Sequence, residues 1–143
     1  MGRRSEGDGS RRGLQVALAT IGSVATGFGA AGVAMGAHGV MGGGRVPANV
    51  DSELRFFAAW YTVLGILVLG AARRPESAAA TVRACGGGFL LAACGRVLSM
   101  RAVGPPSTLF RVLTGVELAV PAVVIPWQGR VRRRSIPAAS GAA

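Results

Sequence analysis

Residues 56–72 read FFAAWYTVLGILVLGAA, an uncharged run bounded by Arg55 on one side and by Arg73 and Arg74 on the other. A helix that crosses the hydrocarbon core of a membrane needs roughly 20 residues, with a range of about 17–25. Residues 64–72 also lack the polar face that a helix of a soluble domain would present to water. The run therefore predicts one short membrane-crossing helix.

Three further apolar blocks lie before and after this run, and the last two contain charged residues. Backbone groups in lipid must be satisfied within the segment, so runs of this length are helical. A buried pair of soluble helices is the alternative for the last two blocks. We expect an all-α, integral membrane four-helix bundle over residues 13–129. Its spans are predicted at about 14–38, 54–72, 84–103 and 108–128.

Most of the positive charge of the chain lies outside the predicted spans. Its 143 residues include 16 basic residues, all of them arginine, and six acids, for a net charge of +10. Eleven of the arginines fall in residues 1–12, 73–83 and 130–143. Arginine marks the cytoplasmic side of a membrane protein. We therefore expect both termini on the cytoplasmic side of the membrane, and the lipid bilayer rather than nucleic acid as the partner.

The two ends of the chain are rich in Gly, Ser, Arg, Pro and Ala, so residues 1–12 and 130–143 are expected to be disordered tails. A cleaved signal peptide is the alternative interpretation of the first apolar block. That block is longer than the roughly 7–15 apolar residues of a signal peptide, which favours a retained span.

Two charges inside the predicted spans are expected to meet. Arg96 lies seven residues before Val103, and Glu117 lies nine residues after Thr108, which are the outer ends of spans three and four. At 1.5 Å per residue these depths are roughly 10 and 13 Å. The two spans are joined by the short turn Gly104–Ser107 and should run antiparallel, so an Arg96–Glu117 contact is geometrically natural.

A charge within a membrane needs a reason, because it is costly there. Pro121 has no N–H to donate to the carbonyl of Glu117, which leaves an acceptor beside the acid. One interpretation is an outward-facing polar cluster of Arg55, Arg96, Arg111 and Glu117. The other is a structural ion pair that joins spans three and four.

Small residues predict where helices pack closely in a membrane. Gly32 and Gly36 form a GxxxG pattern, either within the bundle or in a homo-oligomer. Ala84, Gly88 and Ala92 recur every four residues and lead to Arg96, which would place this arginine on a packed face.

No cofactor or metal site is expected. Cys85 and Cys94 are nine residues apart on one predicted helix and face opposite ways, so they cannot bridge each other. His38 has no second ligand at metal-binding spacing.

The second half of the chain resembles a known family. Glu53-Leu54-Arg55-Phe56-Phe57, Gly95-Arg96-Val97-Leu98-Ser99, Gly104-Pro105 and Glu117-Leu118 with Pro121 follow one another in this order. This combination resembles the domain of unknown function 4345 family of small bacterial four-helix membrane proteins. The resemblance is carried by about residues 51–128. It implies this fold in the inner membrane of a bacterium, with both termini in the cytoplasm as the charge predicts, but no activity, ligand or catalytic residue.

The expected function is that of a non-enzymatic membrane component that binds a ligand, a lipid or a partner through the polar cluster. A small proton-coupled transporter acting as an oligomer is the alternative, since a membrane acid can carry protons. An acid neutralised by an arginine at the same depth is a poor coupling site. No arrangement of Cys, His or Ser and Lys predicts an enzyme.

Overall fold

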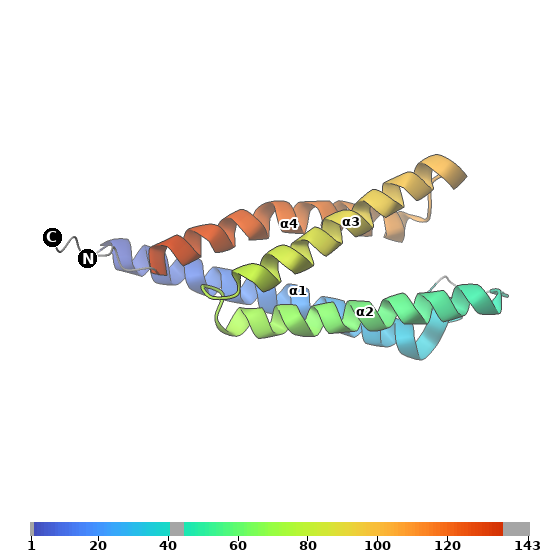
Figure 1. Cartoon of the computed structure of the whole chain (residues 1–143), viewed down its shortest axis with the longest axis horizontal. Helices are drawn as coiled ribbons and strands as arrows, with labels where there is room; N and C mark the ends of the chain where they lie inside the picture. Colours follow the sequence, from blue (N-terminus) through green and yellow to red (C-terminus); the bar gives the residue numbers. More distant parts are fainter. Residues whose placement is uncertain (1, 41–44, 136–143) are drawn as a thin grey trace. The chain divides into compact units, whose positions relative to one another are not determined.

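The computed structural model describes residues 2–40 and 45–135, and the side chains of residues 7–39 and 45–135. Within these residues the chain is all-helical (Figure 1). The helices are α1 (Gly2–Val40), α2 (Ala48–Arg73), α3 (Ala79–Val103) and α4 (Thr108–Ser135). Each is long and apolar enough to cross a membrane. The predicted all-α fold of four membrane-spanning helices is thus confirmed.

The helices extend beyond the predicted spans. α1 is helical from Gly2, where a disordered tail over residues 1–12 was expected, and α4 continues to Ser135 and contains the whole basic run at residues 130–134. Arginine is a good helix former, so the ends of the apolar runs do not end the helices. The rest of the C-terminal tail, residues 136–143, and the glycines at 42–44 lie outside the described residues.

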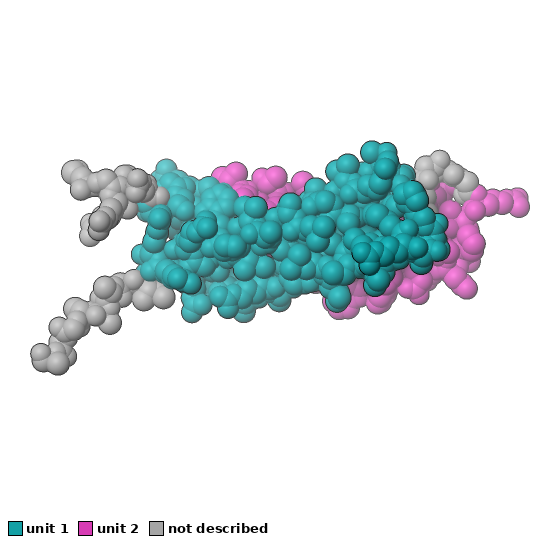
Figure 2. All heavy atoms as spheres, turned by 90° about the horizontal axis from the view of Figure 1, so that it is seen from above, with its two compact units in different colours: residues 1–14, 74–143 teal, residues 15–73 magenta. Residues whose placement is uncertain are grey.

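The chain divides into two compact units (Figure 2). Unit 1 consists of residues 1–14 and 74–143, which hold the start of α1 and all of α3 and α4. Unit 2 consists of residues 15–73, which hold the rest of α1 and all of α2.

In unit 2, α1 and α2 approach closely at glycines. A Cβ atom built on Gly22 would lie 2.8 Å from the carbonyl oxygen of Gly65, and one on Gly29 would lie 2.6 Å from the amide nitrogen of Thr62. A Cβ on Gly32 would lie 2.8 Å from the Cβ of Ala58. These contacts are the small-residue packing that lets membrane helices approach without side chains between them. Gly32 therefore packs against α2 inside the unit, which is one of the two alternatives that the GxxxG pattern left open.

Gly36 is also buried against α2, because a Cβ atom built on it would meet the side chains of Asp51 and Arg55. Its backbone lies at φ 63° and ψ −166°, so α1 kinks there. A residue with a side chain rarely adopts a positive φ, whereas glycine does so readily. Both glycines of the GxxxG pattern thus lie against α2, and Gly36 also turns the chain.

In unit 1, α3 and α4 form an antiparallel hairpin. Gly104 ends α3 at φ 99°, and its N–H donates to the carbonyl of Met100 at 3.1 Å. The residues of α3 that are buried are Val82, Cys85, Gly86 and Ala93.

The predicted packing stripe of α3 is incorrect. Ala84 and Gly88 are exposed and Ala92 is only half-buried, whereas Gly86 lies against α4. Residues four apart on a helix are separated by about 400° at 3.6 residues per turn, so a four-residue repeat drifts by about 40° at each step. Ala84 and Arg96 are therefore about 120° apart and do not share a face.

We expect the exchange of Gly86 for alanine to change stability differently from the same exchange at Gly88. A Cβ on Gly86 would lie 2.8 Å from the Cδ1 of Ile125, a flexible chain end, while nothing lies within 4 Å of Gly88. Alanine favours a helix by about 0.8–1.0 kcal/mol over glycine. Gly88→Ala should gain about this much in a denaturant titration, and Gly86→Ala should gain less or lose. An equal gain at both positions would contradict the packing of Gly86.

Candidate functional site

The centre of the α3–α4 hairpin holds the expected ion pair. The Nε of Arg96 donates to Oε2 of Glu117 at 2.8 Å, and its Nη2 donates to Oε1 at 3.2 Å. Two parallel bonds of this kind fix both the distance and the orientation of the groups. Glu117 is 2% exposed, while the Arg96 side chain keeps 28% of its surface. The acid is therefore buried and the arginine is reachable from one side.

An aromatic ring accompanies the pair. The Cζ of Arg96 lies 5.4 Å from the centre of the Phe110 ring, within the range of a cation–π interaction. Sequence reasoning missed Phe110, although it lies seven residues before Glu117 and hence on the same side of α4. Between them, buried Thr114 donates its hydroxyl to the carbonyl of Phe110 at 2.8 Å.

Pro121 is buried one turn after Glu117. It has no N–H and so cannot donate to the carbonyl of Glu117, as the sequence implied. The hydrogen bonds described for Arg96 go to the carboxylate of Glu117. The described hydrogen bonds of the guanidinium thus go to the side chain of Glu117 and not to its carbonyl.

The other two arginines of the predicted cluster have partners of their own. Arg111 is exposed and donates from Nη2 to the hydroxyl of Thr108 at 3.0 Å. It lies six residues before Glu117, which places it about 120° from the face that carries the acid. The contacts thus unite Arg96 with Glu117 and give Arg111 a separate place at the start of α4.

Arg55 belongs to unit 2, where it forms a second polar group. Its Nε donates to Oδ2 of Asp51 at 2.8 Å, and its Nη1 donates to the carbonyls of Val33 and Ala34. The Oδ1 of Asp51 accepts the N–H of Ala37 at 2.7 Å. Asp51 and Arg55 thereby satisfy backbone groups of α1 on both sides of its kink. The four predicted residues consequently form one ion pair and two separate contacts.

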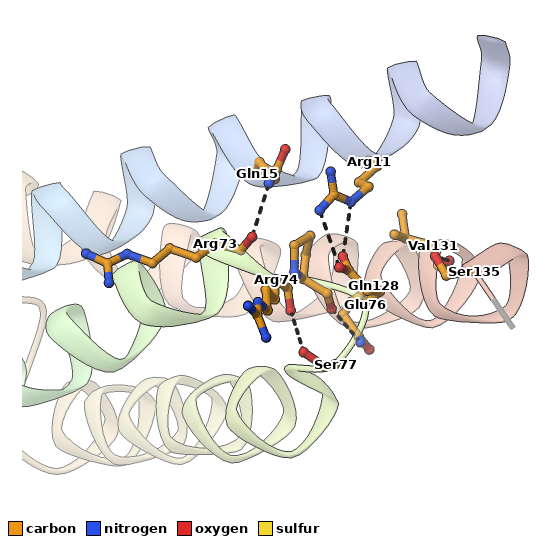
Figure 3. A network of polar contacts seen from close by, with 10 residues as sticks. Arg11, Gln15, Arg73, Arg74, Glu76, Ser77, Gln128, Val131 and Ser135 are labelled. Carbon is orange, nitrogen blue, oxygen red and sulfur yellow. Dashed lines mark hydrogen bonds and ion pairs between the residues drawn. The ribbon is translucent and has the colours of Figure 1, made fainter. Parts of the chain in front are cut away.

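A third polar network lies at the loop between α2 and α3 (Figure 3). Arg11 donates from Nε to Oε2 of Glu76 at 3.1 Å, and Gln128 donates to the carbonyl of Pro75 at 3.0 Å. The indole N–H of Trp127 donates to the hydroxyl of Ser10 at 3.0 Å. These bonds join the start of α1, the loop and the end of α4, so Ser10 and Arg11 of the expected tail have partners within the unit.

Stability should depend on pH through Glu76. The hydrogen bond from Arg11, together with a backbone hydrogen bond, lowers the pKa of Glu76 below its usual value. A carboxyl with a lowered pKa in the folded state stabilises fully above its unfolded pKa of about 4.3. This stabilisation is lost as the pH falls through the lower folded value.

We therefore expect Glu76→Gln to lower the melting temperature at pH 7 by a small amount, because the pair is partly exposed. The difference from wild type should shrink as the pH falls below about 4. Melting curves between pH 3 and pH 7 measure it. A difference that stays constant over this range would contradict a contribution from the ionised carboxylate.

The part of the chain with described side chains contains no group of three or more His, Cys, Asp or Glu residues that could hold a metal ion. Cys85 is buried and Cys94 is exposed, and both are free thiols.

The model of the family named Domain of unknown function (DUF4345) matches residues 13–128. The chain belongs to this family. The DUF4345 match contains α2 and α3 and the larger parts of α1 and α4, and it includes Arg96, Phe110 and Glu117. No curated protein and no solved structure matches the chain. The description of the DUF4345 family gives no activity for these residues, and only their geometry indicates a role.

Proposed function

We propose that this DUF4345 protein is a non-enzymatic, multi-pass component of the bacterial inner membrane that binds a ligand, a lipid or a partner at Arg96 and Glu117. The observation that carries the proposal is a buried carboxylate paired with an arginine that retains exposed surface. Charged groups inside membrane helices are functional candidates by default, because they are costly to keep there.

The N–H donors of Arg96 that Glu117 does not use suggest which groups the ligand contains. A guanidinium has five N–H donors, and the bonds to Glu117 use its Nε and Nη2 atoms. The remaining donors and the Phe110 ring would suit a molecule that has an acceptor oxygen next to an apolar body. Glu117 balances the charge of Arg96, which supports binding of such a molecule rather than proton coupling as in a transporter.

The proposed orientation places this site toward the outer side. The arginines at residues 73–83 and 130–134 favour a cytoplasmic location of the α2–α3 loop and of both termini. A reporter active only in the cytoplasm should report when fused after Arg83, and should stay silent when inserted at residues 45–47. The reverse pattern would overturn the orientation without affecting the ion pair.

The binding proposal is tested on molecules that purify with the protein. Wild-type protein extracted from native membranes in a mild detergent should carry a small molecule detectable by mass spectrometry. Phe110→Ala leaves the ion pair in place and should lower the amount bound. Arg101→Gln, an exposed arginine at the end of α3, is the control and should retain it. Identical spectra for wild type and Phe110→Ala would overturn the proposal.

A further inference from the structure

The opposite end of the α3–α4 hairpin gathers positive charge. We call it the basic end and define it by Arg12, Arg74, Arg83, Arg130 and the arginines at 132–134. Arg12 is one residue beyond Arg11 on α1, Arg74 lies in the loop, and Arg83 lies in the second turn of α3. All seven are exposed.

Contacts within unit 1 bring these arginines together. The Arg11–Glu76 ion pair joins α1 to the loop, and the Gln128–Pro75 hydrogen bond joins the loop to α4 (Figure 3). Arg130 and residues 132–134 follow Gln128 by two to six residues, a distance of roughly 3–9 Å along α4. Segments from three parts of the sequence thus form one charged end.

The acids of this end do not neutralise it. Glu76 forms its ion pair with Arg11, which is not one of the seven arginines. Asp8 is the other acid with a described side chain here, and no ion pair of the described side chains joins it to any of the seven arginines. Within residues 7–39 and 45–135, no ion pair involves any of the seven arginines, so their charges are not balanced by such pairs.

We propose that the basic end binds the phosphate groups of anionic phospholipids in the membrane that the helices cross. Guanidinium groups match phosphate oxygens with two parallel hydrogen bonds, and each arginine near an anionic leaflet adds attraction. The position favours lipid over nucleic acid, because apolar helices begin directly at this end and because the indole of Trp127 is typical of the headgroup level.

The two tryptophans of the chain allow a local test. Trp127 lies at the basic end, and Trp60 lies on α2, where it is 55% exposed. The protein is reconstituted in vesicles that contain brominated phosphatidylglycerol, which is anionic, or brominated phosphatidylcholine, which is not. Bromine quenches nearby tryptophan. Trp60→Phe leaves Trp127 as the reporter, and Trp127→Phe leaves Trp60.

At low salt we expect the lipid near Trp127 to favour phosphatidylglycerol by about fivefold or more, since one arginine contributes about 1 kcal/mol at an anionic surface. The preference should approach one in Arg132→Gln/Arg133→Gln/Arg134→Gln and in about 1 M salt, where charges are screened. Unchanged quenching by brominated phosphatidylcholine shows that this variant is still inserted. Arg101→Gln, at the far end of α3, is the control and should keep the preference.

Three outcomes would overturn the proposal. Equal affinity of the Trp127 region for the two lipids would show that the basic end does not select anionic headgroups. An equally strong preference at Trp60 would show that the selection is not a property of this end. Complete loss of the wild-type preference when RNA is added, at a salt concentration where the preference otherwise persists, would assign the surface to nucleic acid.

Discussion

Glu117→Gln is expected to destabilise the detergent-solubilised protein by about 3 kcal/mol. Removing one partner of a buried ion pair costs about 3–5 kcal/mol, because the other charge is left uncompensated. The lower end applies here, since 28% of the Arg96 side chain remains exposed. Glutamine keeps the shape of the side chain, so the loss reflects charge rather than packing. Reversible unfolding in a denaturing detergent measures it.

A double-mutant cycle separates this coupling from other effects. Arg96→Gln and Glu117→Gln should each destabilise, and the double variant should lose clearly less than their sum. The exchanged pair, Arg96→Glu with Glu117→Arg, should recover part of the loss. Arg101→Gln serves as the control for removal of an arginine from the same helix. Strictly additive losses would contradict an energetic coupling between the two side chains.

Gly29→Ala should destabilise unit 2 by about 2–3 kcal/mol, the upper part of the range for overpacking. The added Cβ would lie 2.6 Å from the amide nitrogen of Thr62 and 2.7 Å from the carbonyl oxygen of Ala58. Both are backbone atoms of α2, so they can give way only if the helix moves. This distinguishes Gly29 from Gly86, whose neighbour is the end of the flexible Ile125 side chain.

Gly27 provides the matched control, since it lies two residues away on the same helix and has nothing within 4 Å of its Cβ position. Gly27→Ala should stabilise by up to about 1 kcal/mol through helix propensity. The two substitutions thus have opposite signs despite identical chemistry. Equal effects of Gly27→Ala and Gly29→Ala on unfolding would mean that α1 and α2 do not approach closely at Gly29.

Hydropathy and depth predicted the parts of this structure that depend on length along a helix. Four apolar runs predicted four helices, and the distances of Arg96 and Glu117 from their common turn predicted that these residues meet. Depth depends only on the rise per residue, which is nearly constant. The depth of a residue can therefore be predicted from a single sequence.

Rotation around a helix was harder to predict. The stripe from Ala84 to Arg96 was wrong because small errors in angle accumulate at each step, whereas the eleven residues from Cys85 to Arg96 return to the same face within about 20°. The contacts of Arg55 with α1 depend on the kink at Gly36, which a GxxxG pattern does not reveal. Arg111 is likewise separated from Glu117 by its angle around α4, which the estimate of depth did not take into account.

The kink at Gly36 has a consequence for the order in which the protein is made. The carbonyls of Val33 and Ala34 and the N–H of Ala37 receive their partners from Arg55 and Asp51, which are synthesised later. Backbone groups without partners are unfavourable in lipid. When only α1 has been synthesised, these backbone groups at the kink therefore lack the partners that α2 provides. Synthesis of the first turns of α2 supplies Asp51 and Arg55 as these partners. The second helix thus stabilises the kinked shape of the first during insertion.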